Sequence, residues 1–141
     1  MNNLKKLRKF LKLTQQDISN LIEVKRNTYS DYERKKLDFP IEKLNIIANK
    51  YGLSLDYLLD LTNDYKSTVK EKNIERKEIG NILKELRKKT YLNQLELAKL
   101  LNTHQSKISI YEKGKSIDFK VLKKYAKFFH KTIDYLCGKE I

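Results

Sequence analysis

The side chains in this chain that are best suited to molecular recognition gather at the start of one predicted helix, residues 105–112. Gln105, Ser106 and Lys107 follow one another there, and Ile110 comes one turn later. Side chains three or four residues apart share a helical face, so this face combines hydrogen-bond donors and acceptors with one apolar contact. Such a face is suited to reading the base edges of DNA.

Other kinds of chemistry lack the residues they need. The chain has two histidines, His104 and His130, and one cysteine, Cys137. There is no Cys/His zinc spacing, no His-based triad and no glycine-rich phosphate loop. We therefore expect no enzymatic activity, no metal or other cofactor and no small-molecule substrate. A lone cysteine cannot form an internal disulfide, and we interpret Cys137 as a small buried apolar residue in a reducing cytoplasm.

Helices must position these residues, because the chain has only 4 Gly and 1 Pro and its Leu and Ile recur at three- and four-residue steps. The predicted fold class is all-α. In the helix at 94–101, Leu97, Ala98 and Leu101 are expected to bury against Ile108 and Tyr111, and the small Ala98 allows a close crossing. The approximate helices are 3–11, 15–22, 26–33, 41–51 and 55–60, followed by 77–89, 94–101, 105–112, 119–129 and 133–137.

The chain contains an internal repeat. A shift of 79 residues aligns Leu4–Lys36 with Leu83–Lys115 and gives 12 identities in 33 positions. Dropping one residue from the next loop changes the shift to 78 and aligns Leu55-Asp56-Tyr57-Leu58 with Ile133-Asp134-Tyr135-Leu136. A duplicated five-helix domain explains this pattern. We predict domain 1 at 1–62, a polar linker at 63–76 and domain 2 at 77–141.

Both repeats resemble the Cro and lambda-repressor type of helix-turn-helix domain, the XRE family of bacterial and phage regulators. The shared pattern is a Gln at the start of the second helix, a hydroxyl residue and an aromatic before a Glu that ends the third, and a later Ile/Leu-Asp-Tyr-Leu. It appears as Gln15 and Ser30-Asp31-Tyr32-Glu33, and again as Gln94 and Ser109-Ile110-Tyr111-Glu112. The resemblance covers about four fifths of the chain.

The resemblance implies a DNA-binding transcription regulator, most simply a repressor, whose third helix enters the major groove. Gln and Asn suit adenine, Arg suits guanine and Ile can meet a thymine methyl, so the two domains should prefer different half-sites. The implied base-reading residues are Arg26, Asn27 and Asp31 in repeat one and Gln105, Ser106 and Ile110 in repeat two. The implied phosphate-binding residues are Gln15, Lys36, Gln94, His104, Lys113 and Lys115. The implied structural salt bridges are Arg8–Glu33 and Arg87–Glu112.

Repeat one departs from the family pattern at two positions. Glu23 stands where Gly or Asn is expected, and Lys25 replaces the usual hydroxyl cap of the third helix; each change costs about 1 kcal/mol. An alternative is therefore that repeat one is a degenerate copy that serves dimerisation. Tyr29, Tyr32 and Tyr111 are assigned to the core, while Tyr57 and Tyr135 either pack locally or line a contact. We expect a solvated helix face at Lys123, Lys124, Lys127 and Lys131.

The net charge of +13 favours a polyanion as partner. No apolar run is long enough for a membrane span, so we expect a cytoplasmic protein that binds double-stranded DNA and not membranes. A homodimer or a protein partner is left open. The rival hypothesis is a protein-interaction module, such as an antitoxin or an anti-repressor, that uses the same fold.

Overall fold

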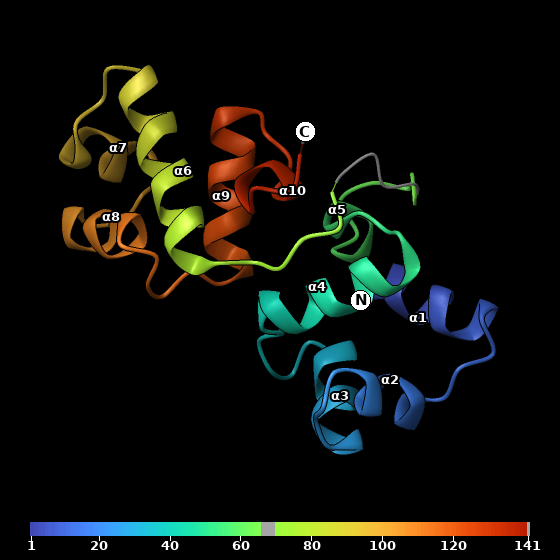
Figure 1. The fold of residues 1–141 in the computed structure, drawn as a ribbon. Helices are drawn as coiled ribbons and strands as arrows, with labels where there is room; N and C mark the ends of the chain where they lie inside the picture. Colours follow the sequence, from blue (N-terminus) through green and yellow to red (C-terminus); the bar gives the residue numbers. More distant parts are fainter. Residues whose placement is uncertain (66–69, 141) are drawn as a thin grey trace. The chain divides into compact units, whose positions relative to one another are not determined.

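The computed structural model describes residues 1–65 and 70–140, and within them the chain forms α-helices and no strand. The helices, which Figure 1 labels, are α1 (Asn2–Phe10), α2 (Gln15–Leu21), α3 (Arg26–Glu33), α4 (Ile41–Tyr51), α5 (Leu55–Leu58), α6 (Arg76–Lys89), α7 (Gln94–Leu100), α8 (Gln105–Glu112), α9 (Phe119–Phe129) and α10 (Ile133–Leu136). The all-α prediction is confirmed, and each predicted helix is present with ends within two residues.

The chain divides into two compact units, unit 1 at Met1–Asn73 and unit 2 at Ile74–Glu140. The boundary between the units falls inside the predicted linker, residues 63–76, so most of that segment belongs to unit 1. Residues 66–69 of the predicted linker lie outside the described part of the chain. The Nδ2 atoms of Asn45 and Asn49 donate hydrogen bonds to the Lys72 carbonyl at 2.7 and 3.1 Å. Lys72 is therefore hydrogen-bonded to α4 of unit 1, and α6 begins four residues later at Arg76.

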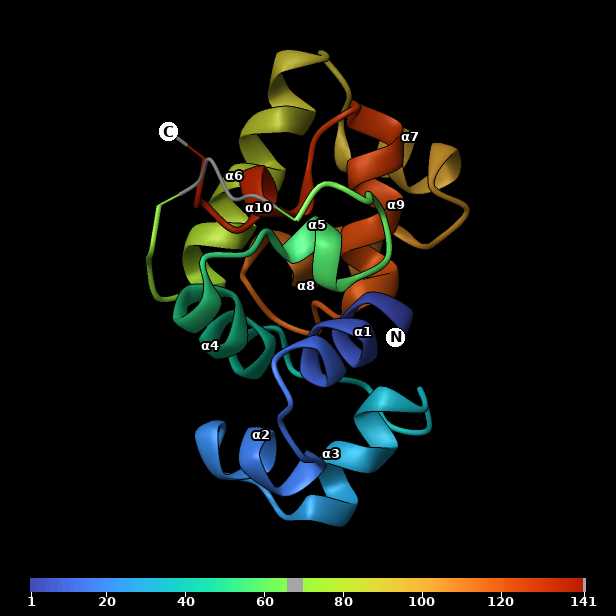
Figure 2. The ribbon, with the colours of Figure 1, turned by 90° about the vertical axis from the view of Figure 1, so that its right-hand side faces the viewer.

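In unit 1, α2 and α3 lie together at one end, α5 lies at the other, and α1 and α4 lie between them (Figures 1 and 2). The start of α1 is fixed by the segment after α5, because the backbone N–H groups of Asn2 and Asn3 donate to the Asp60 carboxylate at 3.0 and 2.7 Å. Asp60 itself has φ 62, a left-handed conformation that ends α5 earlier than predicted. The core side chains include Leu4, Ile18, Ile22, Leu44, Leu55 and Leu58.

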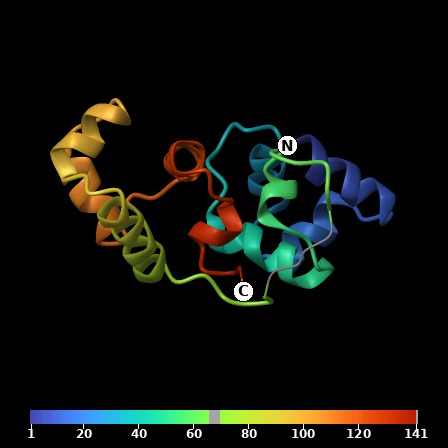
Figure 3. The ribbon, with the colours of Figure 1, turned by 90° about the horizontal axis from the view of Figure 1, so that it is seen from above.

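In unit 2, two glycines allow α6 to pack closely on the end of α8, and the chain path from α6 to α10 can be followed in Figure 3. A Cβ on Gly80 would lie 2.6 Å from the backbone nitrogen of Gly114 and 2.7 Å from the backbone carbonyl oxygen of Glu112. Gly114 has φ +82, and a Cβ there would lie 2.5 Å from the Arg76 oxygen. Side chains at either position would push the two segments apart.

The two cores place their large aromatic residue on different helices. In the repeat alignment Tyr29 of α3 corresponds to Ile108 of α8, and Ile47 of α4 corresponds to Tyr125 of α9. All four side chains are fully buried. Both tyrosine hydroxyls lie close enough to the Arg–Glu pair of their own unit to feel its charges, and burial raises the pKa of each hydroxyl. Each core thus contains one tyrosine and one isoleucine in exchanged positions.

Among residues 1–65 and 70–140, every helix is too short or too polar to span a lipid bilayer.

Candidate nucleic-acid interface

Each unit contains two consecutive helices joined by the same turn, α2 with α3 in unit 1 and α7 with α8 in unit 2. Glu23 and Asn102 occupy the left-handed region at φ 58 and 56. One residue later, the backbone N–H of Val24 donates to the Ser19 carbonyl at 3.0 Å, and the backbone N–H of Thr103 donates to the Ala98 carbonyl at 2.8 Å. This closing bond is typical of a helix that ends in a left-handed residue. The chain direction changes in the same way in both units.

Small and apolar side chains lock each pair of helices together. Ala98 in α7 is buried as predicted, and Ser19 at the matching position in α2 is also buried. The Ser19 hydroxyl donates to the backbone carbonyl of Gln16 at 2.8 Å, so this buried hydroxyl has a hydrogen-bond partner within its own helix. The predicted core contacts Leu97, Leu101 and Ile108 are buried, and Tyr111 is half-buried. The inner faces of α3 and α8 are therefore buried by packing, and their outer faces are exposed to solvent.

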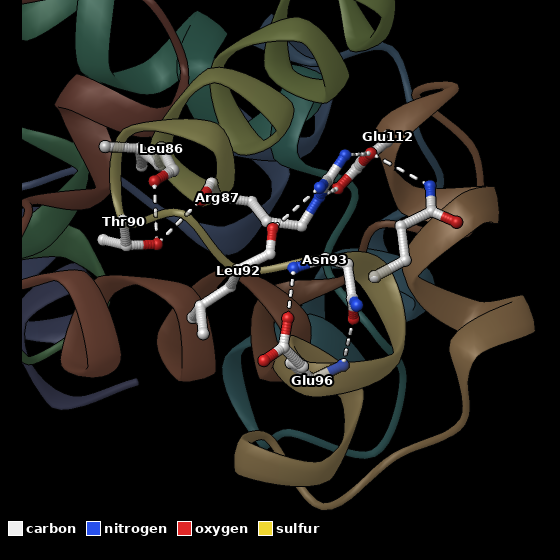
Figure 4. A network of polar contacts seen from close by, with 8 residues as sticks. Leu86, Arg87, Thr90, Leu92, Asn93, Glu96 and Glu112 are labelled. Carbon is white, nitrogen blue, oxygen red and sulfur yellow. Dashed lines mark hydrogen bonds and ion pairs between the residues drawn. The ribbon is translucent and has the colours of Figure 1, made fainter.

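A buried ion pair holds the end of α8 against α6 (Figure 4). The Nε of Arg87 donates to Glu112 Oε2 at 2.6 Å, and its second terminal nitrogen donates to Glu112 Oε1 at 3.0 Å. The Arg87 Nη1 donates to the Leu92 carbonyl at 2.9 Å, which ties the loop before α7 to the same guanidinium. The hydrogen bonds between the Arg87 guanidinium and the Glu112 carboxylate raise the pKa of Arg87, so Arg87 stays charged.

Unit 1 repeats this arrangement with Arg8 and Glu33. The Nε and Nη2 of Arg8 donate to the two carboxylate oxygens of Glu33 at 2.8 and 3.2 Å, and the Nη1 of Arg8 donates to the Leu13 carbonyl at 3.1 Å. Burial alone would raise the pKa of Glu33, but the hydrogen bond and the charge of Arg8 outweigh it and hold that pKa below its usual 4.5. Both predicted salt bridges are thus present, and their side chains are nearly enclosed.

The glutamines that begin α2 and α7 turn their amides toward these ion pairs. Gln15 Nε2 donates to Glu33 Oε1 at 3.4 Å, and Gln94 Nε2 donates to Glu112 Oε1 at 3.1 Å. In this structure the amide nitrogens of both side chains therefore serve the fold, and a phosphate contact from Gln15 or Gln94 would fall to other atoms of these residues.

Capping boxes, which the sequence analysis did not identify, fix the starts of α2 and α7. The Thr14 hydroxyl accepts from the Asp17 N–H at 3.0 Å while the Asp17 carboxylate accepts from the Thr14 N–H at 2.7 Å. Asn93 and Glu96 make the same reciprocal pair, at 2.8 and 3.0 Å (Figure 4). The signal was present in the sequence as Thr-x-x-Asp and Asn-x-x-Glu.

The predicted base-reading residues lie on the outer faces of α3 and α8. Arg26 and Asn27 are exposed at the start of α3, and Gln105 and Ser106 are exposed at the start of α8. One turn later, Asp31 and Ile110 are half-buried at matching positions. Asp31 differs from its counterpart because its carboxylate accepts a 2.8 Å hydrogen bond from Arg34. The two helices therefore present chemically different side chains at matching positions.

Apart from the two glutamines, the predicted phosphate contacts are three lysines and one histidine near the ends of α3 and α8. Lys36, Lys113 and Lys115 are exposed and follow the ends of α3 and α8. His104 is exposed at the N-cap of α8 but its side chain makes no capping bond, and Lys25 occupies the same position of α3, also without one. Among the described residues no group of three His, Cys, Asp or Glu side chains could hold a metal ion.

The remaining predictions are also located. Tyr29 and Tyr32 are buried, Tyr57 packs edge-on against Tyr65, and Cys137 is buried. The predicted solvated face is exposed at Lys123, Lys124, Lys127 and Lys131, and Lys131 lies 4.6 Å above the ring of Tyr135.

Comparison with known proteins gives two family matches. Residues 1–64 match a family described as "Helix-turn-helix domain", and residues 83–136 match one described as "Helix-turn-helix". A relative in Bacillus subtilis (strain 168), named "Uncharacterized HTH-type transcriptional regulator YobD", is 38% identical over 72 residues. That alignment covers 51% of this chain and 64% of the relative, so a third of the relative lies beyond it.

Proposed function

Since the chain is an XRE-family helix-turn-helix transcription regulator with two such domains in tandem, we propose that it reads DNA with α3 and α8, each inserted into a major groove, and that it acts as a repressor. DNA binding belongs to the family. The role of the third helix and the direction of regulation are the proposal.

The observation that carries the proposal is the split between the two faces of α3 and α8. The inner face of each helix is held by the turn before it and by the buried ion pair of its own unit. The first turn of α3 exposes Arg26 and Asn27 to solvent, and the first turn of α8 exposes Gln105 and Ser106. A rigid helix with exposed polar side chains at its start matches the way helix-turn-helix proteins contact base edges.

The two helices would read different bases. Arg26 can form a bidentate pair with guanine, and the Asp31 carboxylate can accept from cytosine N4. On α8, Gln105 suits adenine and the half-buried Ile110 can touch a thymine methyl. We therefore propose an asymmetric operator in which one chain contacts two unlike half-sites.

Selection of bound sequences from random DNA tests this reading. The full chain, a Gln105→Ala/Ser106→Ala variant and an Arg26→Ala/Asn27→Ala variant are compared with Lys123→Ala, whose side chain is exposed on α9 outside both faces. Each double variant should lose preference at its own half-site, at about 1–3 kcal/mol per base contact. Sequence preferences identical to those of Lys123→Ala would contradict the roles assigned to these helices.

The phosphate and repressor roles have separate readouts. Lys115→Ala should weaken binding to all sequences alike and reduce the slope of log K against log salt by about 1. Transcription in vitro from a promoter that overlaps the selected site should fall as the chain is added. Increased transcription would show an activator and leave the base-reading assignment standing.

A further inference from the structure

Unit 1 has an apolar groove that the proposed function does not use. Its volume is about 560 Å³, and it runs between α1 and the segment that contains the end of α4 and α5. We call it the α1 groove, and its lining residues are Lys6, Leu7, Phe10, Leu11, Tyr51, Leu53, Tyr57 and Tyr65. None of them belongs to the candidate DNA-binding set. The volume is within the range of sites that receive a few large side chains or a small ligand.

The rim of the α1 groove exposes large apolar side chains to water. Phe10 is 83% exposed, Tyr65 57% and Leu11 37%. Scattered apolar residues are common on protein surfaces, but a contiguous patch around a groove marks an interaction site. Three exposed rim residues also favour a macromolecule over a small ligand, because a small ligand would leave most of Phe10 in water.

Unit 2 shows that the helix-turn-helix fold does not require these apolar residues. In the repeat alignment Phe10 corresponds to Lys89, Leu11 to Thr90 and Leu53 to Lys131. Lys131 covers the ring of Tyr135 in unit 2, whereas the matching Tyr57 of unit 1 forms a wall of the groove. Both units keep the same helices and ion pair, so the apolar character of the α1 groove is a property added to unit 1.

The charge beside the groove indicates what it binds. α1 forms one wall of the groove and is strongly basic, because Lys5, Lys6 and Lys9 are exposed on it and Lys12 follows its end, while Lys6 lines the groove itself. The nearby Asp60 carboxylate is occupied by the first N–H groups of α1. A symmetric contact between two copies through this groove would bring two such basic helices together, and like charges at an interface oppose association. A partner with acidic residues would be attracted by the lysines of α1.

We propose that the α1 groove binds an amphipathic helix of another protein, whose apolar stripe fills the groove and whose acidic residues face the α1 lysines. Helices bind apolar grooves through anchors at positions i, i+3 or i+4, and i+7, and a volume of about 560 Å³ accommodates such a set. The site is separate from α3, so a regulatory protein can engage unit 1 without covering the base-reading residues.

Selection from a library of 16-residue helical peptides tests the proposal on the full chain. The selected peptides should carry Leu, Ile, Phe or Met at one helical face and Glu or Asp beside it. The matched variant is Phe10→Lys/Leu11→Thr, which installs the residues of unit 2 at two exposed positions. Because this variant is more basic than the wild type, general attraction of acidic peptides would increase. We nevertheless expect its Kd for the selected peptides to rise about 10- to 100-fold, since the variant loses the apolar surface of Phe10 and Leu11 that a bound peptide would cover.

Three results would overturn the proposal. The first is a peptide set without acidic enrichment, or one that binds the variant as well as the wild type. The second is a dimer of the wild type that Phe10→Lys/Leu11→Thr dissociates in sedimentation, which would identify a second copy as the occupant. The third is binding to vesicles of phosphatidylglycerol with no peptide selected, which would identify a lipid surface. Circular dichroism and unchanged affinity for operator DNA verify that the variant is folded.

Discussion

Replacing Arg87 by alanine tests whether the buried ion pair holds unit 2 together. The side chains of Arg87 and Glu112 are 11% and 4% exposed, so the substitution leaves a carboxylate in the interior without its cation. The Leu92 carbonyl also loses its 2.9 Å donor. Removing one partner of a buried pair costs about 3–5 kcal/mol. Because a unit of this size unfolds with about 3–10 kcal/mol, the variant should lose a large part of the stability of unit 2.

Urea unfolding combined with hydrogen exchange measures this loss unit by unit. Amides of α6, α7 and α8 should exchange much faster in Arg87→Ala, while amides of α1, α2 and α3 serve as the internal reference. Lys88→Ala is the matched control, because Lys88 is the exposed neighbour on the same helix and should change the free energy of unfolding by less than about 0.5 kcal/mol. The free energy of unfolding should therefore be nearly equal for the wild type and Lys88→Ala, and much lower for Arg87→Ala.

A double substitution separates the charge effect from lost packing. Arg87→Met/Glu112→Leu removes both charges and should be more stable than Arg87→Met alone, because no uncompensated charge remains. The reasoning is refuted if Arg87→Ala behaves like Lys88→Ala, or if the double variant loses the sum of the two single losses.

Three further outcomes are expected. Because the folded pKa of Glu33 lies below 4.5, its ion pair stabilises unit 1 above that pH and is lost as pH falls through the folded value; Glu33→Gln should flatten the slope of unfolding free energy between about pH 5 and 3. Lys25→Ser should supply the missing cap of α3 and raise the unfolding free energy by about 1 kcal/mol in urea melts. Tyr125→Phe removes a buried hydroxyl without a hydrogen-bond partner among the described residues, so its Tm should rise, corresponding to about 1 kcal/mol; a lower Tm would contradict this.

Most of the fold could be predicted because helical periodicity and the internal repeat support each other. The left-handed turn at Asn102 and the Arg87–Glu112 pair followed from residue type and from the family pattern, and both are present. The helix-turn-helix family itself is confirmed for both halves. The base-reading residues stay a prediction, since their exposure is compatible with that role and only DNA can test it.

Other features depend on contacts that a single sequence does not reveal. The inward turn of Gln15 and Gln94 requires Glu33 and Glu112 to lie beside the helix starts, about 18 residues away in the chain. The attachment of Lys72 to Asn45 and Asn49 made a segment that looks like a polar linker part of unit 1. The α1 groove combines residues from α1 and from beyond α4, and the repeat alignment alone contained a hint of it in the replacement of Phe10 by Lys89.

The exchanged tyrosines determine which helices of the two units are compatible with one another. A crossover between the two halves that brought α3 into the place of α8 would put Tyr29 and Tyr125 in one core, and the reciprocal product would hold Ile108 and Ile47 where a ring is needed. The first hybrid is overfilled and the second contains a void, and interiors tolerate neither well. The third and fourth helices of each unit therefore form a matched pair, and neither helix can be exchanged between the units without changing its partner.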